Sequence, residues 1–356
     1  MAGRLVSLDV LRGLTVAGMI LVNSAAYVHY VNGFPAYPAL MHSAWAGLTL
    51  ADWVFPAFLF MVGVSVPMAA RGRPPGIGKI LARAGRLILV GLLLTNMYWL
   101  ADLDAYAFRP FGVLQRIGLV YGAVALLFMA TGWRTRLGIA GQILILYWPL
   151  CLIPSPDGTA TDIWARGYDF VAWFDRAVLG DHAYVKGPAG YDPEGILSTL
   201  PAVAQGLIGC LVGEWLLKRP DRTGVLALAG AAMTLGGLGW GLVFPVVKDI
   251  WTSSYVLLTS GLTLLVLSAL HVRLDGRDVG RGWTLATAFG VNAIAAYVLH
   301  YLASVVLAAD VMKLPYAWAA PAIGGPAAAL IPVLIFLALN WAAMAWLQRK
   351  GWVIRI

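Results

Sequence analysis

Long apolar stretches, separated by turn-forming or charged residues, follow one another along most of the 356-residue chain. A helix that crosses the bilayer needs about 20 apolar residues. Stretches of that length lie at 10–31, 48–70, 80–99, 113–131, 137–154, 195–217, 223–243, 254–271, 283–306 and 327–347. The pattern predicts an all-α polytopic membrane protein, a bundle of about ten transmembrane helices in a single domain over residues 1–356.

The Lys and Arg residues are divided unequally between the two sets of connectors that ten helices would create. Eighteen of the 25 lie on one side and seven on the other. Those seven are Arg109, Arg116, Arg166, Arg176, Lys186, Lys248 and Lys313. Because positive residues gather in cytoplasmic loops, both termini are predicted to be cytoplasmic. A wrong helix count would scramble this alternation, so the charges support the count as well.

The first apolar stretch shares features with a cleaved signal peptide, namely Arg4, a short apolar run and Ser24-Ala-Ala. Asp9 and Arg12 interrupt that pattern, however, and the apolar run continues to Val31. We therefore predict a retained first helix, in a multi-pass protein of a bacterial inner membrane.

Composition agrees with a lipid environment. Only 12% of the residues are charged, 60% are hydrophobic, and the mean hydropathy is +0.79, whereas a soluble chain of this length needs many more charges. The net charge of +8 then reflects cytoplasmic loops rather than nucleic-acid binding. Cys151 and Cys210 lie inside apolar stretches without metal-type spacing, and no metal is expected.

The connector at about 155–194 is the only long one on the outer side, and it is predicted to form a periplasmic loop element. It combines six Asp residues with several Trp, Tyr and Phe residues. Carboxylates accept hydrogen bonds and flat rings cover the apolar faces of sugars, so the element suits a sugar or amine ligand. An interfacial lid that merely packs on the bundle explains the same composition.

Polar residues inside apolar stretches are informative because burying them unpaired costs several kcal/mol. The first stretch holds Asp9 and Arg12, which share a helical face, and Asn23 about three turns further on. A local ion pair explains the first two as well as ligand contact does. An intramembrane Asn often only joins helices.

His42 precedes the second stretch, and Asp52 lies ten residues later inside it. A lone loop histidine is usually solvated and idle, but this one lies between an Asn-bearing and an Asp-bearing helix. Acyl transfer to an amine needs a base and donors for an oxyanion. His42 could be that base or a nucleophile, Asp52 could orient its ring, and Asn23 could donate to the oxyanion.

Five further polar residues have structural as well as functional explanations. The adjacent Gln115 and Arg116 open the fourth stretch, where Arg either snorkels or binds a phosphate. Glu194 opens the sixth, where capping accounts for a carboxylate. Asn292 and His300 are eight residues apart and share a face of the ninth. Walker, GxSxG and dinucleotide motifs are absent from the sequence.

Several motifs occur in the order found in the heparan-α-glucosaminide N-acetyltransferase family, and the sequence resembles that family over essentially its whole length. They are Ser7-Leu-Asp9-Val-Leu-Arg12-Gly13 with Val22-Asn23, His42-Ser-Ala-Trp45 with Gly47-Leu-Thr49-Leu-Ala-Asp52-Trp-Val-Phe55-Pro56, Gly112-Val-Leu-Gln-Arg-Ile-Gly118, Tyr191-Asp-Pro-Glu-Gly195, Trp251-Thr-Ser-Ser-Tyr-Val-Leu258 and Gly290-Val-Asn292. Six such motifs in order are hard to obtain by chance.

The resemblance implies a membrane-embedded enzyme that takes acetyl from acetyl-CoA and places it on the amino group of a terminal glucosamine. By that resemblance His42 matches the active-site histidine, Asn23 its paired asparagine and Asp52 the motif carboxylate. The chain lacks the large luminal N-terminal domain of the animal enzyme, so a free amino sugar or a small periplasmic glycan fragment is the expected acceptor. A homodimer is compatible with the family.

The leading hypothesis is therefore N-acetylation of glucosamine or a terminal glucosaminide by acetyl-CoA. O-acylation of a periplasmic glycan is an alternative, as is a transporter or flippase without chemistry, although no repeat between the halves supports transport. The predicted catalytic residues are His42, Asn23 and Asp52. The predicted acceptor-binding residues are Trp45, Glu194, Asn292 and His300, and those for CoA are Arg12, Gln115 and Arg116.

Overall fold

The computed structural model describes residues 5–71, 75–275 and 283–354. Within these ranges the regular structure is helical, apart from two isolated β-bridges, Ala46–Val247 and Val185–Tyr191. The predicted all-α class is thereby confirmed. The chain divides into two compact units, one comprising residues 1–43, 48–58 and 266–356 and the other residues 44–47 and 59–265.

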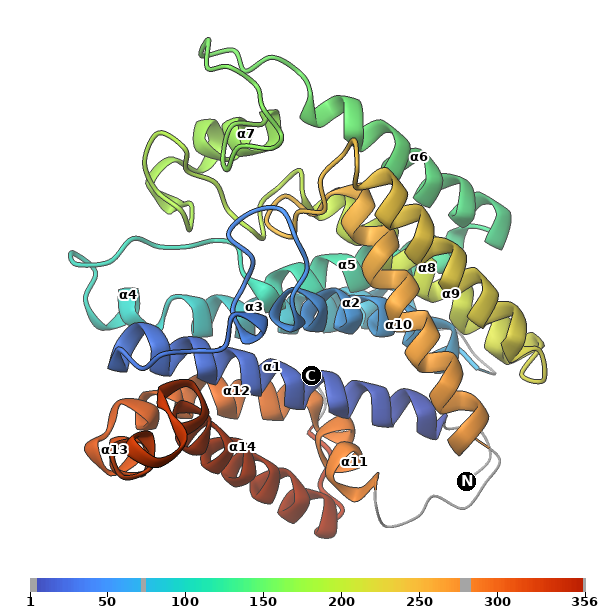
Figure 1. Cartoon of the computed structure of the whole chain (residues 1–356). Coiled ribbons are helices and arrows are strands. Elements are labelled where there is room, and N and C mark those ends of the chain that lie inside the picture. Colours follow the sequence, from blue (N-terminus) through green and yellow to red (C-terminus); the bar gives the residue numbers. More distant parts are fainter. Residues whose placement is uncertain (1–4, 72–74, 276–282, 355–356) are drawn as a thin grey trace. The chain divides into compact units, whose positions relative to one another are not determined.

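The first unit is built around one long helix, α1 (Val6–Asn32), seen in blue in Figure 1. The elements that follow in this unit are η1 (Pro38–Leu40), the start of α2 (Leu50–Ala69), the end of α10 (Ser253–Leu274), α11 (Thr284–Val291), α12 (Ala293–Ala303), η4 (Ser304–Ala308), α13 (Asp310–Ile323) and α14 (Gly325–Arg349). Helices α11, α12 and α14 pack along α1.

Glycine lets α1 and α11 approach closely. A Cβ atom built on Gly13 would lie 1.7 Å from the carbonyl oxygen of Ala286, and one on Gly290 would lie 2.0 Å from that of Asp9. Neither position can carry a side chain without moving a backbone. This explains the glycine of the Gly290-Val-Asn292 motif by packing.

The second unit contains the remaining helices. They are the rest of α2, α3 (Ile77–Thr95), α4 (Met97–Ala101), α5 (Val113–Ala130), α6 (Trp133–Cys151), α7 (Phe170–Leu179), η2 (Gly180–His182), α8 (Thr199–Lys218), α9 (Thr223–Trp240) and the first part of α10. Helix α5 packs against α3 and α8, and α8 also packs against α6. Helix α7, with its N-cap Asp169, lies within the predicted loop element.

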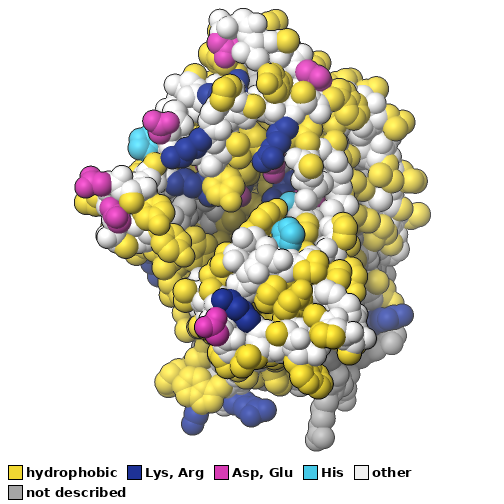
Figure 2. Space-filling view, turned by 60° about the vertical axis from the view of Figure 1, so that its left-hand side comes forward, with side chains coloured by type: hydrophobic (Ala, Val, Ile, Leu, Met, Phe, Trp, Pro, Cys, Tyr) yellow, Lys and Arg dark blue, Asp and Glu magenta, His cyan; other side chains and the backbone are white. Residues whose placement is uncertain are grey.

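Apolar side chains are spread widely over the face shown in Figure 2, and charged side chains are fewer among them. Along α9, Leu228, Leu235 and Leu238 are 73%, 69% and 51% exposed. A leucine-rich face of this kind on a long apolar helix suits hydrocarbon rather than water. The polytopic membrane character predicted from composition is therefore consistent with the structure.

Seven described helices, α1, α2, α5, α8, α9, α10 and α14, are long and apolar enough to cross a membrane. An eighth span results if α11 and the helical residues 293–308 are counted together, although they are bent by 87°. Helix α3 carries Lys79, Arg83 and Arg86, and α6 begins with Arg134 and Arg136. All ten predicted stretches contain helix, but ten spans and the orientation of the termini stay predictions.

Five of the eighteen positive residues on the predicted cytoplasmic side lie outside the described residues. They are Arg4, Arg73, Arg277, Arg281 and Arg355. Near two of these positions, Asp275 holds the start of α1, because its carboxylate accepts hydrogen bonds from the backbone of Val6 at 2.7 Å and of Ser7 at 3.2 Å. The N-terminal residues of α1 are thus fixed to the end of α10.

Candidate active site

The first unit brings two of the predicted catalytic residues into direct contact. The Nδ1 atom of His42 lies 2.7 Å from Oδ1 of Asp52. The side chain of His42 is 46% exposed, whereas that of Asp52 is 1% exposed. A buried carboxylate therefore holds a histidine ring that remains accessible from outside the unit.

Asp52 itself is held in place by its own helix start. Its Oδ2 atom accepts hydrogen bonds from the backbone N–H of Ser43 at 3.0 Å and of Thr49 at 3.2 Å, and from the Thr49 hydroxyl at 3.0 Å. The hydroxyl of Thr49 also contacts the carbonyl oxygen of Met41 at 2.8 Å. Helix α2 begins at Leu50, so Asp52 reaches back to the residue preceding the helix, as an acidic side chain does in a capping box.

These contacts favour one direction for the hydrogen bond between His42 and Asp52. A carboxylate that accepts several hydrogen bonds is stabilised in its ionised form, and an ionised carboxylate can only accept. Nδ1 of His42 is then the donor to Asp52. In the neutral ring with this arrangement, Nε2 carries the lone pair and is the nitrogen that accepts a proton or attacks a carbonyl carbon.

Asn23, the third predicted catalytic residue, lies on α1 and is partly buried. Its neighbour Val22 belongs to a small apolar cluster with Met19, Ala51 and Val54, and Ala51 directly precedes Asp52. The packing thus aligns this part of α1 with the first turn of α2. No hydrogen bond of the Asn23 side chain is formed within the described ranges, so a contact with His42 stays a prediction.

Arg12, predicted for CoA, forms the local ion pair that the sequence suggested. Its Nη1 atom lies 3.1 Å from Oδ1 of Asp9 and 3.5 Å from the carbonyl oxygen of Gly290. The Arg12 side chain is 22% exposed. It therefore contacts α11 and retains an accessible surface.

Asn292 lies at the bend between α11 and α12, and His300 lies on α12. The side chain of Asn292 donates to the carbonyl oxygen of Trp352 at 3.1 Å and accepts from the backbone N–H of Ile354 at 2.9 Å. The ring of His300 packs against Phe336 on α14 at 5.8 Å, with Nδ1 buried and without a hydrogen-bond partner in the described chain. An acceptor-binding role for either residue stays a prediction.

The second unit contains a dense charged cluster that the sequence did not predict. Arg109, just before α5, bonds Asp192 through Nε at 3.0 Å and Nη2 at 2.8 Å, and bonds Glu194 through Nη2 at 2.6 Å. Its guanidinium also covers the ring of Tyr184 at 4.4 Å. Asp192 is 1% exposed and Glu194 8%. One arginine thus compensates two buried carboxylates.

Electrostatics in this cluster favour the charged forms. Burial opposes the charge of Arg109, but its hydrogen bond to Asp192 and the attraction of both carboxylates outweigh burial and raise the pKa of Arg109. Burial alone would raise the pKa of Glu194, whereas the positive charges of Arg109, Arg116 and Lys248 bring that pKa below its ordinary value.

Two aspartates of the loop element behave differently because burial dominates. Burial raises the pKa of Asp175 to about 7, although the backbone N–H groups of Asp192 and Ile196 oppose the shift. Burial likewise raises the pKa of Asp169 to about 6, against hydrogen bonds from the backbone of α7. These two carboxyl groups accept hydrogen bonds from the backbone N–H groups of Ala172, Asp192 and Ile196. A ligand-binding role for the loop element stays a prediction.

Gln115 and Arg116 lie next to this cluster at the start of α5. Gln115 donates to the Thr95 hydroxyl at 3.3 Å. Arg116, fully buried, donates through Nη2 to the Ser198 hydroxyl at 2.5 Å and lies 4.9 Å from the Trp251 ring. Its Nε and Nη1 atoms have no hydrogen-bond partner among the described residues. A buried cation with vacant donors fits an anionic ligand.

Trp251 is held in an uncommon backbone conformation beneath Arg116. Its φ angle is 54°, the left-handed region that bulky residues rarely adopt. The indole N–H donates to Oε1 of Gln205 at 3.0 Å, and the side chain is 1% exposed. Backbone strain of this kind persists only where the surrounding residues fix the conformation. The Trp251 ring held in this way forms an apolar wall next to the Arg116 guanidinium.

Trp45, predicted to bind the acceptor, is part of the core of the second unit. Its indole N–H donates to the carbonyl oxygen of Ile163 at 3.0 Å, and its ring meets Tyr191 edge-on at 5.7 Å. The Tyr191 hydroxyl in turn donates to Asp249 at 2.5 Å. The described residues contain no group of three or more His, Cys, Asp or Glu side chains arranged for a metal.

Sequence reasoning missed Thr49, Arg109 and Asp192. The spacing Thr49-x-x-Asp52 is the capping-box pattern and could have identified Thr49. Arg109 and Asp192 are 83 residues apart in the sequence, and no local pattern indicates that they pair.

Comparison with known proteins identifies the family to which the chain belongs. A family model described as heparan-alpha-glucosaminide N-acetyltransferase, catalytic, matches residues 4–229. The human protein of that name is 30% identical over 364 residues, covering 83% of this chain and 52% of the human protein. The mouse protein is 28% identical over 363 residues, covering 84% and 53%.

The chain spans about half the length of these curated relatives. The match to the family model includes the His42–Asp52 pair and the Arg109–Asp192–Glu194 cluster. The chain belongs to the heparan-alpha-glucosaminide N-acetyltransferase family.

Proposed function

We propose that the protein transfers acetyl from acetyl-CoA to the amino group of glucosamine or of a terminal glucosaminide. The observation that carries the proposal is the 2.7 Å contact between the half-exposed His42 ring and the buried Asp52 carboxylate. An accessible imidazole with a fixed tautomer is what proton transfer from an attacking amine requires. The names of the relatives supply the donor and acceptor classes.

The proposed topology has ten spans with both termini in the cytoplasm of a bacterial cell, in its inner membrane. It is supported by the unequal distribution of the 25 Lys and Arg residues and by the helices found in all ten apolar stretches. In this orientation His42 lies at the outer face and meets a periplasmic amine. The residues after α14 are cytoplasmic.

The proposed chemistry needs one base and one oxyanion donor. As the acceptor amine attacks the thioester carbonyl carbon, the C–N bond forms and Nε2 of His42 takes the proton from nitrogen. The tetrahedral oxyanion is stabilised by the side-chain amide of Asn23. The C–S bond then breaks, the carbonyl re-forms, and the His42 proton goes to the departing thiolate. In the covalent variant, Nε2 attacks the thioester carbon and the C–S bond breaks, giving acetyl-histidine and CoA thiolate. The amine then attacks this acetyl group, the bond to Nε2 breaks, and the amine proton passes through Nε2 to the thiolate.

The residues proposed for CoA are Arg12, if CoA enters from the cytoplasmic face, or Gln115 and Arg116, if it enters from the outer face. CoA carries phosphate groups, for which a guanidinium with vacant donors is the preferred partner. Arg12 offers an accessible guanidinium in the first unit, and Arg116 offers buried Nε and Nη1 donors in the second. The residues proposed to bind the acceptor are Trp45 and Glu194, which belong to the motifs that resemble the family, and Asn292 and His300, which are polar residues within an apolar stretch.

The test uses the purified full chain in lipid nanodiscs, labelled acetyl-CoA and glucosamine. His42→Ala is expected to lower transfer at least a hundredfold, because a positioned general base contributes about 10²–10⁴-fold. His29→Ala is the matched control, since His29 lies in the same unit and bonds only the carbonyl oxygen of Phe34 in the described structure, at 2.7 Å. Equal rates for wild type and His42→Ala would refute the proposal.

Mass spectrometry of protein quenched after mixing with acetyl-CoA alone separates the two chemical routes. Acetyl on His42 supports the covalent variant, and its absence together with active transfer supports direct attack. Replacing glucosamine by sugars that offer only hydroxyl groups tests the acceptor. Faster transfer to hydroxyl than to amine would contradict N-acetylation.

A further inference from the structure

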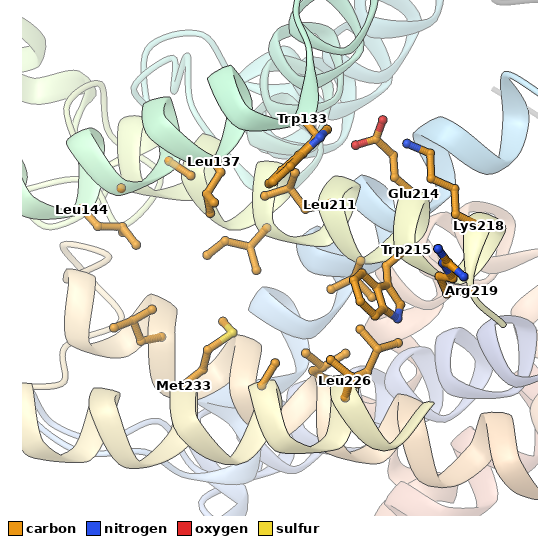
Figure 3. A pocket seen from close by; sticks show the side chains of 18 residues that line it. Trp133, Leu137, Leu144, Leu211, Glu214, Trp215, Lys218, Arg219, Leu226 and Met233 are labelled. Atoms are coloured by element: carbon orange, nitrogen blue, oxygen red, sulfur yellow. The ribbon is translucent and has the colours of Figure 1, made fainter. Parts of the chain in front are cut away.

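A cavity of about 730 Å³ lies between α6, α8, α9 and α10 within the second unit (Figure 3). Its walls are largely apolar and include Leu137, Leu211 and Met233. Leu137 is 53% exposed and Val225, another lining residue, 46%, so the cavity opens to the surface of the helices. None of the proposed catalytic or CoA-binding residues lines it.

The two ends of the cavity differ in polarity. Figure 3 shows Glu214, Lys218 and Arg219 together with Trp133 and Trp215 toward one end, and Leu144 toward the other. The charged end is where α6 begins and α8 finishes. Tryptophan beside Lys and Arg at helix ends is typical of the border between membrane and water. The charged end therefore lies at a membrane surface.

The length of the cavity matches one leaflet. Trp133 and Leu144 are eleven residues apart on α6, as are Ile208 and Arg219 along α8 and its C-cap. At 1.5 Å per residue both walls extend over roughly 16 Å. Half of the hydrocarbon thickness of a bilayer is about 15 Å. The apolar end thus reaches the depth of the bilayer midplane, as an acyl chain does.

Charge decides which headgroup suits the polar end. Glu214 is compensated by Arg136, whose Nη2 atom donates to it at 2.6 Å. Lys218 and Arg219 form no ion pair with any described residue, so this end has excess positive charge. The indole N–H of Trp215 is buried there, and no acceptor for it exists in the part of the chain that is described. Two cations and one vacant donor suit a phosphodiester.

We propose that this cavity binds one anionic phospholipid, with an acyl chain along its apolar walls and the phosphate between Lys218 and Arg219. The Trp215 indole donates to an oxygen of the lipid backbone. A phosphatidylcholine brings its own cation to the same end and meets Lys218 and Arg219 with repulsion. The site therefore prefers phosphatidylglycerol to phosphatidylcholine. In the topology proposed above, it lies in the cytoplasmic leaflet.

Native mass spectrometry of the full chain, released from micelles that contain equal amounts of both lipids with identical acyl chains, measures this preference. The double variant Lys218→Gln/Arg219→Gln is expected to lower the preference for phosphatidylglycerol roughly thirtyfold, since each basic residue near the headgroup contributes about fivefold. Arg349→Gln/Lys350→Gln removes the same charge at the end of α14 and should leave it intact. An unchanged preference in the first variant, or an equal loss in both, would overturn the proposal.

Filling the cavity gives a test that does not depend on charge. Gly141 lines it, and a Cβ atom there meets nothing within 4 Å. Gly141→Phe should fold, as circular dichroism checks, and should release the bound lipid. Gly138 has equal space on the same helix and does not line the cavity, so Gly138→Phe should retain it. Retention by Gly141→Phe contradicts the site, and so does displacement of the lipid by free glycerol phosphate.

Discussion

The His42–Asp52 pair and the Arg109–Asp192–Glu194 cluster both join a positive or protonatable group to buried carboxylates, yet they differ in two respects. The first pair is ten residues apart and leaves its histidine 46% exposed. The cluster joins residues 83 and 85 apart and encloses its charges. A local, accessible pair can exchange a proton with a substrate, whereas an enclosed and compensated cluster mainly holds distant segments together.

The largest expected effect is on catalysis and concerns the His42–Asp52 pair. Asp52→Asn should reduce acetyl transfer about a thousandfold, because an amide can hold the His42 ring in the wrong tautomer and no longer stabilises its protonated form. Steady-state rates with labelled acetyl-CoA measure the loss, and circular dichroism verifies the fold. A rate near that of wild type would show that His42 works without its carboxylate.

The reciprocal change at the cluster should appear in stability. Arg109→Met leaves Asp192 and Glu194 buried without their cation, and the free energy of unfolding should fall by about 3–5 kcal/mol. Unfolding in denaturant in mild detergent measures it. The triple variant Arg109→Met/Asp192→Asn/Glu194→Gln should recover more than half of the loss. A single variant as stable as wild type would remove the structural role assigned to the cluster.

A smaller effect on catalysis is expected from Thr49, which precedes α2 and contacts Asp52. Thr49→Val removes the hydroxyl that donates to Asp52 at 3.0 Å, and kcat should fall about tenfold, the worth of one hydrogen bond to a charged group. Thr49→Ser keeps the hydroxyl and should restore most of the rate, with the KM for acetyl-CoA unchanged in both variants. Equal losses for Val and Ser would mean that the methyl group matters and the hydroxyl does not.

A gradual effect, spread over several pH units, concerns the loop element. Burial raises the pKa of Asp175 to about 7 in the folded protein, against about 3.9 in an unfolded chain. Between these values the unfolded chain loses the proton and the folded chain keeps it. This carboxyl therefore lowers the free energy of unfolding as pH rises, by up to about 1.4 kcal/mol per pH unit.

Asp175→Asn should remove that component of the pH dependence. Thermal unfolding of both proteins at pH 4.5, 6 and 7.5 provides the comparison. Asp157→Asn serves as the control, because Asp157 is an exposed aspartate of the same element. Parallel pH profiles for wild type and Asp175→Asn would mean that the carboxyl titrates normally.

Much of the helical framework could be predicted because lipid imposes a simple requirement of about 20 apolar residues per span. The bend at Asn292 was not predicted, since the apolar run continues through it. Helix α13 was also missed, because its Pro315 and Pro321 argue against a helix. Helix α7 is short and amphipathic, and its N-cap residue Asp169 is the only sequence signal that indicates where it begins.

The candidate site follows the same division between local and distant information. The His42–Asp52 contact was predictable because both residues flank one helix start and share a plausible chemistry. The pairing of Arg109 with Asp192 depends on how distant segments pack, which no sequence pattern records. The hydrogen bonds between the Asn292 side chain and the backbone of Trp352 and Ile354 depend on tertiary packing in the same way.

The capping interaction between Thr49 and Asp52 also affects the order of events during folding. A loop of ten residues closes in about 10–100 ns, and the first turns of a helix form within about a microsecond. The carboxylate that caps α2 is the one that orients His42, so the imidazole acquires its orientation as soon as that helix starts. During folding in the membrane, the His42 ring can thus reach its final orientation before the slower docking of the remaining helices is complete.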